Sequence, residues 1–374
     1  MMRFATWLLL ALPCAAAPPA TFTPRTLASD LKGGYQVVIA DINNDGKPDI
    51  IALASGLTDL LWFENPTWER HVIAGGLKRM INVAALDTDG DGIPELLVAH
   101  EFSNQAKNSI GIVSLLQHQG DPKNPWSVRE IDRLTTSHRL RVANKAFINQ
   151  PLTGAKADAP EYRDHAPLVM YRPGEWKRET ISHEDEGVVH GIYIVDWDGD
   201  GRDDILTASF VGLHLYRLDK AGKWHRTQIA KGDPAAWPQS GSSDVAVGKL
   251  AGKRFLAAIE PWHGNKVAVY TQRKKEWVRD VIDDKLVDGH TIITADLNGD
   301  GRDEIIAGFR GPGRSVFIYE FDGKTWRRRA LDDGGIAAAA CAAADLNGDG
   351  KIDVVCIGSA TTNLKLYENT TGAR

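Results

Sequence analysis

The chain has 374 residues, of which 43% are hydrophobic and 25% charged, and its formal net charge at pH 7 is −5. These values predict a soluble globular protein with enough chain for a large core. The mild acidic balance offers no electrostatic field that would attract nucleic acid or an anionic membrane surface, so neither partner is expected.

The N-terminus has the features of a secretory signal peptide. A positive start, Met1 to Arg3, precedes an apolar stretch over residues 4–12 and small residues at 15–17. The apolar stretch is too short to span a bilayer, so no membrane span is expected. We predict that residues 1–19 are a signal peptide and that the mature protein is secreted or periplasmic. Lipoprotein anchoring through Cys14 is disfavoured, because Ala-Leu-Pro before it is a poor lipidation site.

An acidic loop of nine residues occurs five times along the chain. Positions 1, 3, 5 and 9 carry Asp, Asn or Glu, and each copy has Gly at position 6, where the chain must bend sharply. Alternate oxygen ligands with a backbone carbonyl at position 7 suit Ca²⁺, so up to five structural Ca²⁺ ions are expected. Solvated Asp/Gly turns would not explain the constant spacing. The predicted ligands are Asp41, Asn43, Asp45, Lys47, Asp49, Asp87, Asp89, Asp91, Ile93, Glu95, Asp196, Asp198, Asp200, Arg202, Asp204, Asp296, Asn298, Asp300, Arg302, Glu304, Asp345, Asn347, Asp349, Lys351 and Asp353.

The loops belong to seven repeats of roughly 50 residues. Degenerate copies without acidic residues fall midway in the two long gaps, near residues 144 and 248. A second motif, an aromatic residue followed five positions later by Ile or Leu, is missing from the C-terminus but present at residues 22–27. We therefore predict an all-β fold over residues 20–374, a seven-bladed β-propeller of four-stranded blades whose last blade is closed by the N-terminal strand.

The Asp-x-Asp/Asn-x-Asp-Gly loops followed by apolar strands resemble the FG-GAP or VCBS repeats of seven-bladed propellers, the class that includes the integrin α-chain head. This resemblance implies a propeller with bound metal. It does not specify a function, because the fold hosts adhesion modules and enzymes alike.

Three histidines share one position in the repeat. Six residues before each loop, at the start of the innermost strand, the seven units carry Tyr35, Ile81, His138, His190, Ser242, His290 and Ala339. Innermost strands line the channel of a propeller, so His138, His190 and His290 should meet at its mouth, on the face away from the acidic loops. The alternative for each is a core histidine bonded to the backbone.

Further polar and aromatic residues should reach the same face, and they suggest a sugar ligand. The histidines could hold a transition metal such as Zn²⁺, with Glu260 or Asp244 completing its shell, or one could act as a general base. No Ser-His-Asp or Cys-His signature appears there, so nucleophilic acyl transfer is disfavoured. The candidate catalytic set is His138, His190, His290, Glu260, Asp244 and Tyr35, and the candidate substrate-binding set is Arg139, Tyr162, His165, Trp237, Trp262 and His263.

The segments around the three histidines, Thr136-Ser-His-Arg139, Val188-Val-His-Gly191 and Asp288-Gly-His290-Thr, resemble the propeller domain of the aldos-2-ulose dehydratase family. The resemblance implies β-elimination from a keto-sugar, with His138 as the base and His190, His290 and Glu260 as ligands or acid/base partners. The fungal family continues into cupin domains beyond the propeller. The competing hypothesis is a calcium-stabilised extracellular scaffold that binds a glycan or a protein without chemistry.

Two cysteines, Cys341 and Cys356, remain after the signal peptide and flank the last acidic loop. They could approach each other across a hairpin. Since two cysteines do not make a disulfide framework, the favoured interpretation is two buried small apolar residues.

Overall fold

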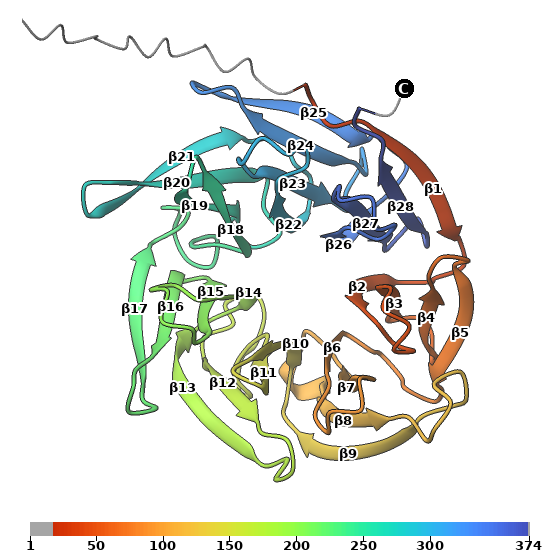
Figure 1. Cartoon of the computed structure of the whole chain (residues 1–374). Coiled ribbons are helices and arrows are strands. Elements are labelled where there is room, and N and C mark those ends of the chain that lie inside the picture. The colour runs from red at the N-terminus through yellow and green to blue at the C-terminus, as the bar shows by residue number, and fades with distance from the viewer. Residues whose placement is uncertain (1–17, 373–374) are drawn as a thin grey trace, which may run out of the picture.

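Seven four-stranded sheets are arranged as a ring around a central channel in the computed structural model, which describes residues 18–372 (Figure 1). Every sheet is antiparallel, and in the first six blades the strands follow one another in chain order from the channel to the rim, whereas the outermost strand of the seventh blade is the first strand of the chain. The only helical segment of the described residues is one turn of 3₁₀ helix, η1 (Ala106–Asn108). The predicted seven-bladed propeller is confirmed.

The strands are grouped by blade. Blades 1 to 3 contain β2 (Gly34–Ala40), β3 (Asp49–Ala54), β4 (Leu60–Glu64), β5 (Glu69–Ala74); β6 (Asn82–Leu86), β7 (Glu95–His100), β8 (Ile112–Gln117), β9 (Ser127–Arg133); β10 (Ser137–Ala143), β11 (Ala146–Pro151), β12 (His165–Tyr171) and β13 (Arg178–Glu186). Blades 4 and 5 contain β14 (Val189–Val195), β15 (Asp204–Ser209), β16 (Gly212–Leu218), β17 (Trp224–Ala230); β18 (Asp244–Leu250), β19 (Lys253–Glu260), β20 (Lys266–Arg273) and β21 (Glu276–Asp283). Blades 6 and 7 contain β22 (Gly289–Ala295), β23 (Glu304–Phe309), β24 (Val316–Phe321), β25 (Trp326–Asp332); β26 (Ala338–Ala344), β27 (Asp353–Gly358), β28 (Leu364–Asn369) and β1 (Phe22–Ala28).

The ring is closed by the two ends of the chain. Strand β1 pairs antiparallel with β28, and the pairing begins with Phe22 opposite Asn369. The first strand therefore completes the last blade, as the displaced aromatic motif predicts. Closure leaves no blade with a missing outer strand, so no extra edge is offered for pairing with other chains.

The second strand of most blades is the centre of the core. In β3, β7, β11, β15, β23 and β27 every residue is buried, because neighbouring blades cover both faces of the sheet. These strands are accordingly rich in Ile, Leu, Val and Ala. Outer strands such as β9 are largely exposed and charged. The result is a rigid ring whose loops are held at its two faces.

The turn between the first and second strand of each blade follows the sequence pattern. Five blades place the acidic loop there. Blades 3 and 5 instead turn through Asn144-Lys145 and Ala251-Gly252, all four residues having positive φ between 49° and 78°. Two such residues make the tight hairpin turn that suits twisted strands. The degenerate copies predicted near residues 144 and 248 are confirmed.

A disulfide joins Cys341 to Cys356, so the interpretation of two unbonded buried residues is wrong. The two cysteines are directly opposite each other in the pairing of β26 with β27, with Cα atoms 4.1 Å apart. A disulfide is compatible with an extracellular protein. Among the described residues no helix is long and apolar enough to cross a membrane. The predicted signal peptide, including Cys14, lies outside the described residues apart from its last two positions.

Candidate functional site

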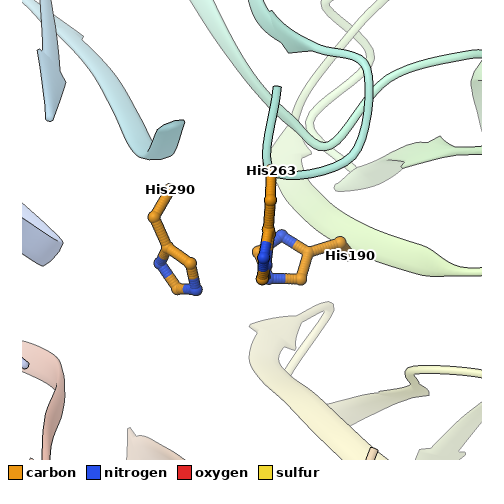
Figure 2. Close-up of side chains that lie close together, drawn as sticks. All are labelled: His190, His263 and His290. Carbon is orange, nitrogen blue, oxygen red and sulfur yellow. Dashed lines mark hydrogen bonds between the residues drawn. The ribbon is translucent and has the colours of Figure 1, made fainter. Parts of the chain in front are cut away.

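Four histidines meet at one mouth of the channel. His190, His263 and His290 each present a ring nitrogen, and these nitrogens all lie within 4.8 Å of one another (Figure 2). The Nε2 atoms of His190 and His263 are 3.4 Å apart. The ring of His138 lies beside this trio, its centroid 5.1 Å from that of His190. The predicted meeting of His138, His190 and His290 is therefore present in the structure, with His263 as a fourth member.

An irregularity in strand pairing directs these side chains into the channel. The register between the first and second strand shifts at Tyr35, His138, His190, His290 and Ala339, each the second residue of its innermost strand. A bulge leaves the extra residue unpaired and changes the direction of its side chain. Because the bulge recurs at one blade position, residues from separate blades point to a common centre.

Each imidazole of the trio has a polar partner at Nδ1. Nδ1 of His290 donates to the carbonyl oxygen of Ala339 at 2.6 Å, and its Nε2 is buried without a partner. Nδ1 of His263 accepts a hydrogen bond from Arg310 at 3.1 Å and lies 3.2 Å from Oδ1 of Asp288. Nδ1 of His190 lies 3.3 Å from the Ser243 hydroxyl. Of these contacts, the bond from His290 to a carbonyl is the kind that orients histidine ligands of metals.

The imidazoles are kept neutral by burial. Desolvation, with help from the Arg139 guanidinium, lowers the pKa values of His138 and His190 well below the ordinary histidine value. Burial and Arg310 do the same to the pKa of His290 and lower that of His263 to about 3. A neutral imidazole has a lone pair, which is needed both for binding a metal and for accepting a proton. Arg139 lies 3.2 Å from Nε2 of His190 and Arg310 lies 3.1 Å from Nδ1 of His263, so a metal would compete with these donors.

The trio has the ligand type and number that a catalytic Zn²⁺ site uses. Tetrahedral Zn²⁺ at about 2.0–2.1 Å from nitrogen ligands places those nitrogens roughly 3.3 Å apart; one pair here is separated by 3.4 Å, and all three nitrogens lie within 4.8 Å. The partnerless Nε2 of His290 is a buried acceptor that such an ion would satisfy. Three protein ligands would leave a fourth position open to substrate.

His138 belongs to a second pair at the mouth. Its Nε2 lies 2.8 Å from the hydroxyl of Tyr35, and its Nδ1 is buried without a partner. The Tyr35 ring also stacks edge-on against His290, with centroids 5.3 Å apart. A cavity of about 480 Å³ opens beside this pair and is lined by Tyr35, His138, His190, His263, Trp262 and Arg310 among others. A monosaccharide-sized ligand fits such a volume.

Two predicted ligands lie elsewhere. Glu260 is fully buried, and its carboxylate accepts bonds from Ser242 at 3.0 Å and Arg279 at 2.7 Å and one from Tyr270. Asp244 faces a separate cavity within the channel, where burial raises its pKa to about 6. The structure therefore places His263, from the β19–β20 loop, where the sequence suggests Glu260 or Asp244.

Asp288 and Arg310 were not among the site residues predicted from the sequence. Arg310 makes two hydrogen bonds to the Asp288 carboxylate, at 3.0 and 3.1 Å, and its guanidinium also lies 3.1 Å from Nδ1 of His263. Asp288 directly precedes β22, and Arg310 directly follows β23. The signal for Arg310 was its place at the end of a second strand, the position that Glu101 occupies in blade 2.

An aromatic wall of Tyr162, Trp262 and Phe210 lies next to the trio, and Tyr162 and Trp262 belong to the predicted substrate-binding set. Tyr162 and Trp262 meet edge to face, with ring centroids 5.5 Å apart, and Phe210 completes their cluster. With His263 and Asp288 they line a neighbouring cavity of about 600 Å³. Trp237 supports this wall from behind by packing on Phe210 and donating to the carbonyl of Glu161. His165 is exposed at the start of β12 and lines none of these cavities, and Arg139 lies beneath His190.

The acidic loops lie at the opposite end of the innermost strands from the histidines. Backbone amides at position 6 of the first loop, and at the equivalent Gly of the others, donate to the first Asp, as Gly46 does to Asp41 at 2.8 Å. Carboxylate oxygens that could hold a metal ion cluster at Asp87, Asp89 and Glu95 and at Asp196, Asp198 and Asp200. The carboxylates at position 9 are buried, and burial raises the pKa of Asp49 to about 6 and that of Glu304 to about 8. A nearby cation would offset that desolvation.

Comparison with known proteins agrees with this geometry. The family model for the aldos-2-ulose dehydratase β-propeller domain matches residues 110–273, which include His138, His190, Trp262 and His263. The chain resembles the propeller domain of aldos-2-ulose dehydratase. An FG-GAP-like repeat model matches residues 41–98 and 296–356. These two regions contain the first two and the last two acidic loops of the chain.

Individual relatives are distant. The aldos-2-ulose dehydratase of Phanerodontia chrysosporium is 24% identical over 354 residues, an alignment that covers 80% of this chain and 39% of that protein. This chain thus spans about two fifths of its relative. Among solved structures, an ancestral GH74 enzyme is 11% identical with a TM-score of 0.59, covering 91% of this chain and 45% of that one. An Agrocybe aegerita lectin that recognises non-reducing terminal N-acetylglucosamine is 13% identical with a TM-score of 0.50, covering 81% of each chain. The two structures show a shared fold.

Proposed function

We propose that this protein is an exported, metal-dependent lyase that removes water from a keto-sugar by β-elimination. The observation that carries the proposal is the convergence of three imidazoles, whose nearest ring nitrogens all lie within 4.8 Å of one another, beside the His138 and Tyr35 pair. The similarity to aldos-2-ulose dehydratase supports the substrate class, and the aromatic wall suits the apolar face of a sugar ring.

His190, His263 and His290 would hold a divalent metal such as Zn²⁺, which when bound supplies a positive charge that polarises the sugar carbonyl. Asp288 holds His263 in the required orientation, and Arg310 holds Asp288. Trp262 and Tyr162 exclude water from one side of the site. These residues fix the carbonyl next to the proton that must be removed.

His138 and Tyr35 would carry the proton transfer. The neutral imidazole takes a proton from the carbon next to the carbonyl, and the electron pair of that C–H bond forms the new C=C bond. The hydroxyl on the neighbouring carbon leaves with its bonding electrons. Tyr35, bonded to the same imidazole, gives that hydroxyl a proton and recovers the one held by His138. The products are an unsaturated keto-sugar and water.

The test is direct. Purified protein is incubated with 1,5-anhydrofructose or a 3-keto-glycoside and with Zn²⁺, Mn²⁺ or Mg²⁺, and enone absorbance is followed in the ultraviolet. We expect turnover by the wild-type protein, and a loss of kcat of about 10²–10⁴-fold in His138→Ala. His225→Ala, on the exposed rim, should behave as wild type. Absence of turnover with every metal would reject the lyase.

A second candidate is binding of a glycan without chemistry. It is favoured by the aromatic cavity of about 600 Å³, which offers Gln239, Asn265 and Asp288 for sugar hydroxyl groups. Calcium-loaded protein that binds oligosaccharides in a calorimeter but turns over no keto-sugar would identify this function.

A further inference from the structure

A second part of the central channel lies next to the histidines. The cavity has a volume of about 480 Å³ and is lined by residues of all seven innermost strands, including Arg139, Arg141, Asp244 and Asn82. Most of its walls are Val, Ile and Ala side chains. His290 is the one member of the metal-binding trio that borders it. The few polar groups in this apolar setting therefore determine what the cavity can bind.

Two arginines, Arg139 and Arg141, line this cavity. Neither Arg139 nor Arg141 has a carboxylate oxygen within 4.0 Å among the described residues. Arg139 donates from Nε to the backbone oxygen of His190 at 2.7 Å, and Arg141 donates to the backbone oxygen of Leu140, also at 2.7 Å. Asp244 is the single acidic residue in the lining. The cavity therefore holds an excess of positive charge in a protein whose net charge is negative.

A third donor belongs to Asn82. This side chain is completely buried, and its Oδ1 accepts bonds from the backbone amide of Leu140 at 2.9 Å and from Arg141 at 3.3 Å. Because both bonds go to the oxygen, the orientation of the amide is fixed, and Nδ2 is left without a partner. Leaving a buried donor without an acceptor is destabilising, so an anion in the cavity that drew this amide toward it would relieve that cost.

We propose that this cavity is a binding site for a compact oxyanion, a carboxylate or sulfate-like group. Planar guanidinium forks match the paired oxygens of such anions, and the Asn82 Nδ2 donor adds a third hydrogen bond. A halide ion would be attracted by the positive charge, but it has no paired oxygen atoms to accept two hydrogen bonds from one guanidinium group. The site is distinct from the histidine trio, and its assignment does not depend on the lyase reaction.

Arg139 would link the anion to the histidines. Its terminal nitrogen lies 3.2 Å from Nε2 and 3.4 Å from Nδ1 of His190. An oxyanion that binds the Arg139 guanidinium from the cavity draws it away from the His190 imidazole. Anion binding and metal binding would then favour each other, since the metal requires the His190 lone pair.

Calorimetric titration of the calcium-loaded full chain with acetate, sulfate and chloride at equal ionic strength tests the site. We expect saturable binding of acetate or sulfate, and a rise in Tm of a few degrees at a hundredfold excess over Kd. Chloride should bind at least tenfold more weakly. Binding of chloride as tight as that of both oxyanions, or no saturable binding of either oxyanion, overturns the proposal.

Two variants locate the site. Arg141→Met removes one fork, and Asn82→Asp keeps the shape and the acceptor while replacing the donor with a repelling carboxylate. Each should weaken oxyanion binding at least tenfold, whereas Arg25→Met on the exposed strand β1 should not. Should Arg141→Met fail to fold, Asn82→Asp alone decides. Binding that persists in the folded variants would place the anion elsewhere, for example at a metal held by the histidines, and overturns the assignment.

Discussion

Nδ1 of His290 donates its proton to the carbonyl oxygen of Ala339 at 2.6 Å, and this bond determines which nitrogen is free. A carbonyl can only accept, so the proton is on Nδ1 and the lone pair is on Nε2. Ala339 is the equivalent residue of the next blade, so one blade orients the candidate ligand of its neighbour. The contact explains how a repeated position with different residues produces a single directed site.

Zinc affinity should depend on the trio and on Asp288. His290→Ala removes a ligand, and Asp288→Asn weakens the bond that orients His263, so we expect the affinity for Zn²⁺ to fall 10–100-fold in the Asp288 variant and further in the His290 variant. Titration calorimetry on calcium-saturated protein measures this. His225→Ala, whose ring pairs with exposed Asp219, should match wild type. Unchanged zinc affinity in both site variants would contradict the predicted ligands.

Calcium should stabilise the ring. An ion at a hundredfold excess over Kd contributes about 2.7 kcal/mol per site, so chelation should lower Tm markedly in differential scanning calorimetry. Asp89→Asn alters one of the two loops in which ligand oxygens already cluster, and should bind one ion fewer and gain less from calcium. Asp158→Asn, in an exposed loop, should respond as wild type. A Tm that chelation leaves unchanged would reject calcium in these loops.

Acid sensitivity should depend in part on His214. Burial lowers its pKa from 6.5 to about 4, and its ring nitrogen Nδ1 has no hydrogen-bond partner. Between these two values the unfolded chain binds one proton more than the folded chain, so stability falls as the pH falls. At about 1.36 kcal/mol per pKa unit, His214→Gln should gain roughly 2–3 kcal/mol relative to wild type when urea unfolding at pH 4 is compared with pH 7.5. An equal loss of stability in both proteins would show that His214 does not drive the effect.

Buried tyrosines should hold neighbouring blades together. The hydroxyl of Tyr319 in blade 6 donates to Asp283 in blade 5 at 2.8 Å, and Arg328 binds the same carboxylate oxygen. Hydrogen bonds to charged groups contribute about 1.5–3 kcal/mol, so Tyr319→Phe should lower the free energy of unfolding by that amount. Tyr193→Phe is the matched control, because its hydroxyl makes one long bond of 3.4 Å to a backbone carbonyl. Equal effects of the two substitutions would contradict the assigned role.

The repeat could be predicted from the sequence because each blade packs the same four strands in the same way and therefore needs the same pattern of residues. A constant spacing of acidic loops and Trp motifs determines seven sheets, and strand direction then places His138, His190 and His290 at one mouth. Features that occur at the same position in every blade can therefore be predicted from the sequence.

The remaining parts of the site depend on contacts that do not repeat. His263 enters the trio through an irregular loop after β19, and no period predicts that conformation. Glu260 ends the same strand but turns toward Tyr270 and Arg279, whose positive charge stabilises its carboxylate. The disulfide follows from strand register, since the nine-residue loop places Cys341 opposite Cys356. Counting residues outward from that loop would have revealed the pairing.

The pairing of β1 with β28 has a consequence for how the protein is made. Residues 22–28 are the first strand of the propeller to be synthesised, yet their partner strand, residues 364–369, is the last. Six sheets can assemble during translation, while strand β1 remains without its partner strand β28. Completion of the circle therefore requires the strands of all seven blades, and it brings the first and last strands of the propeller together in one sheet.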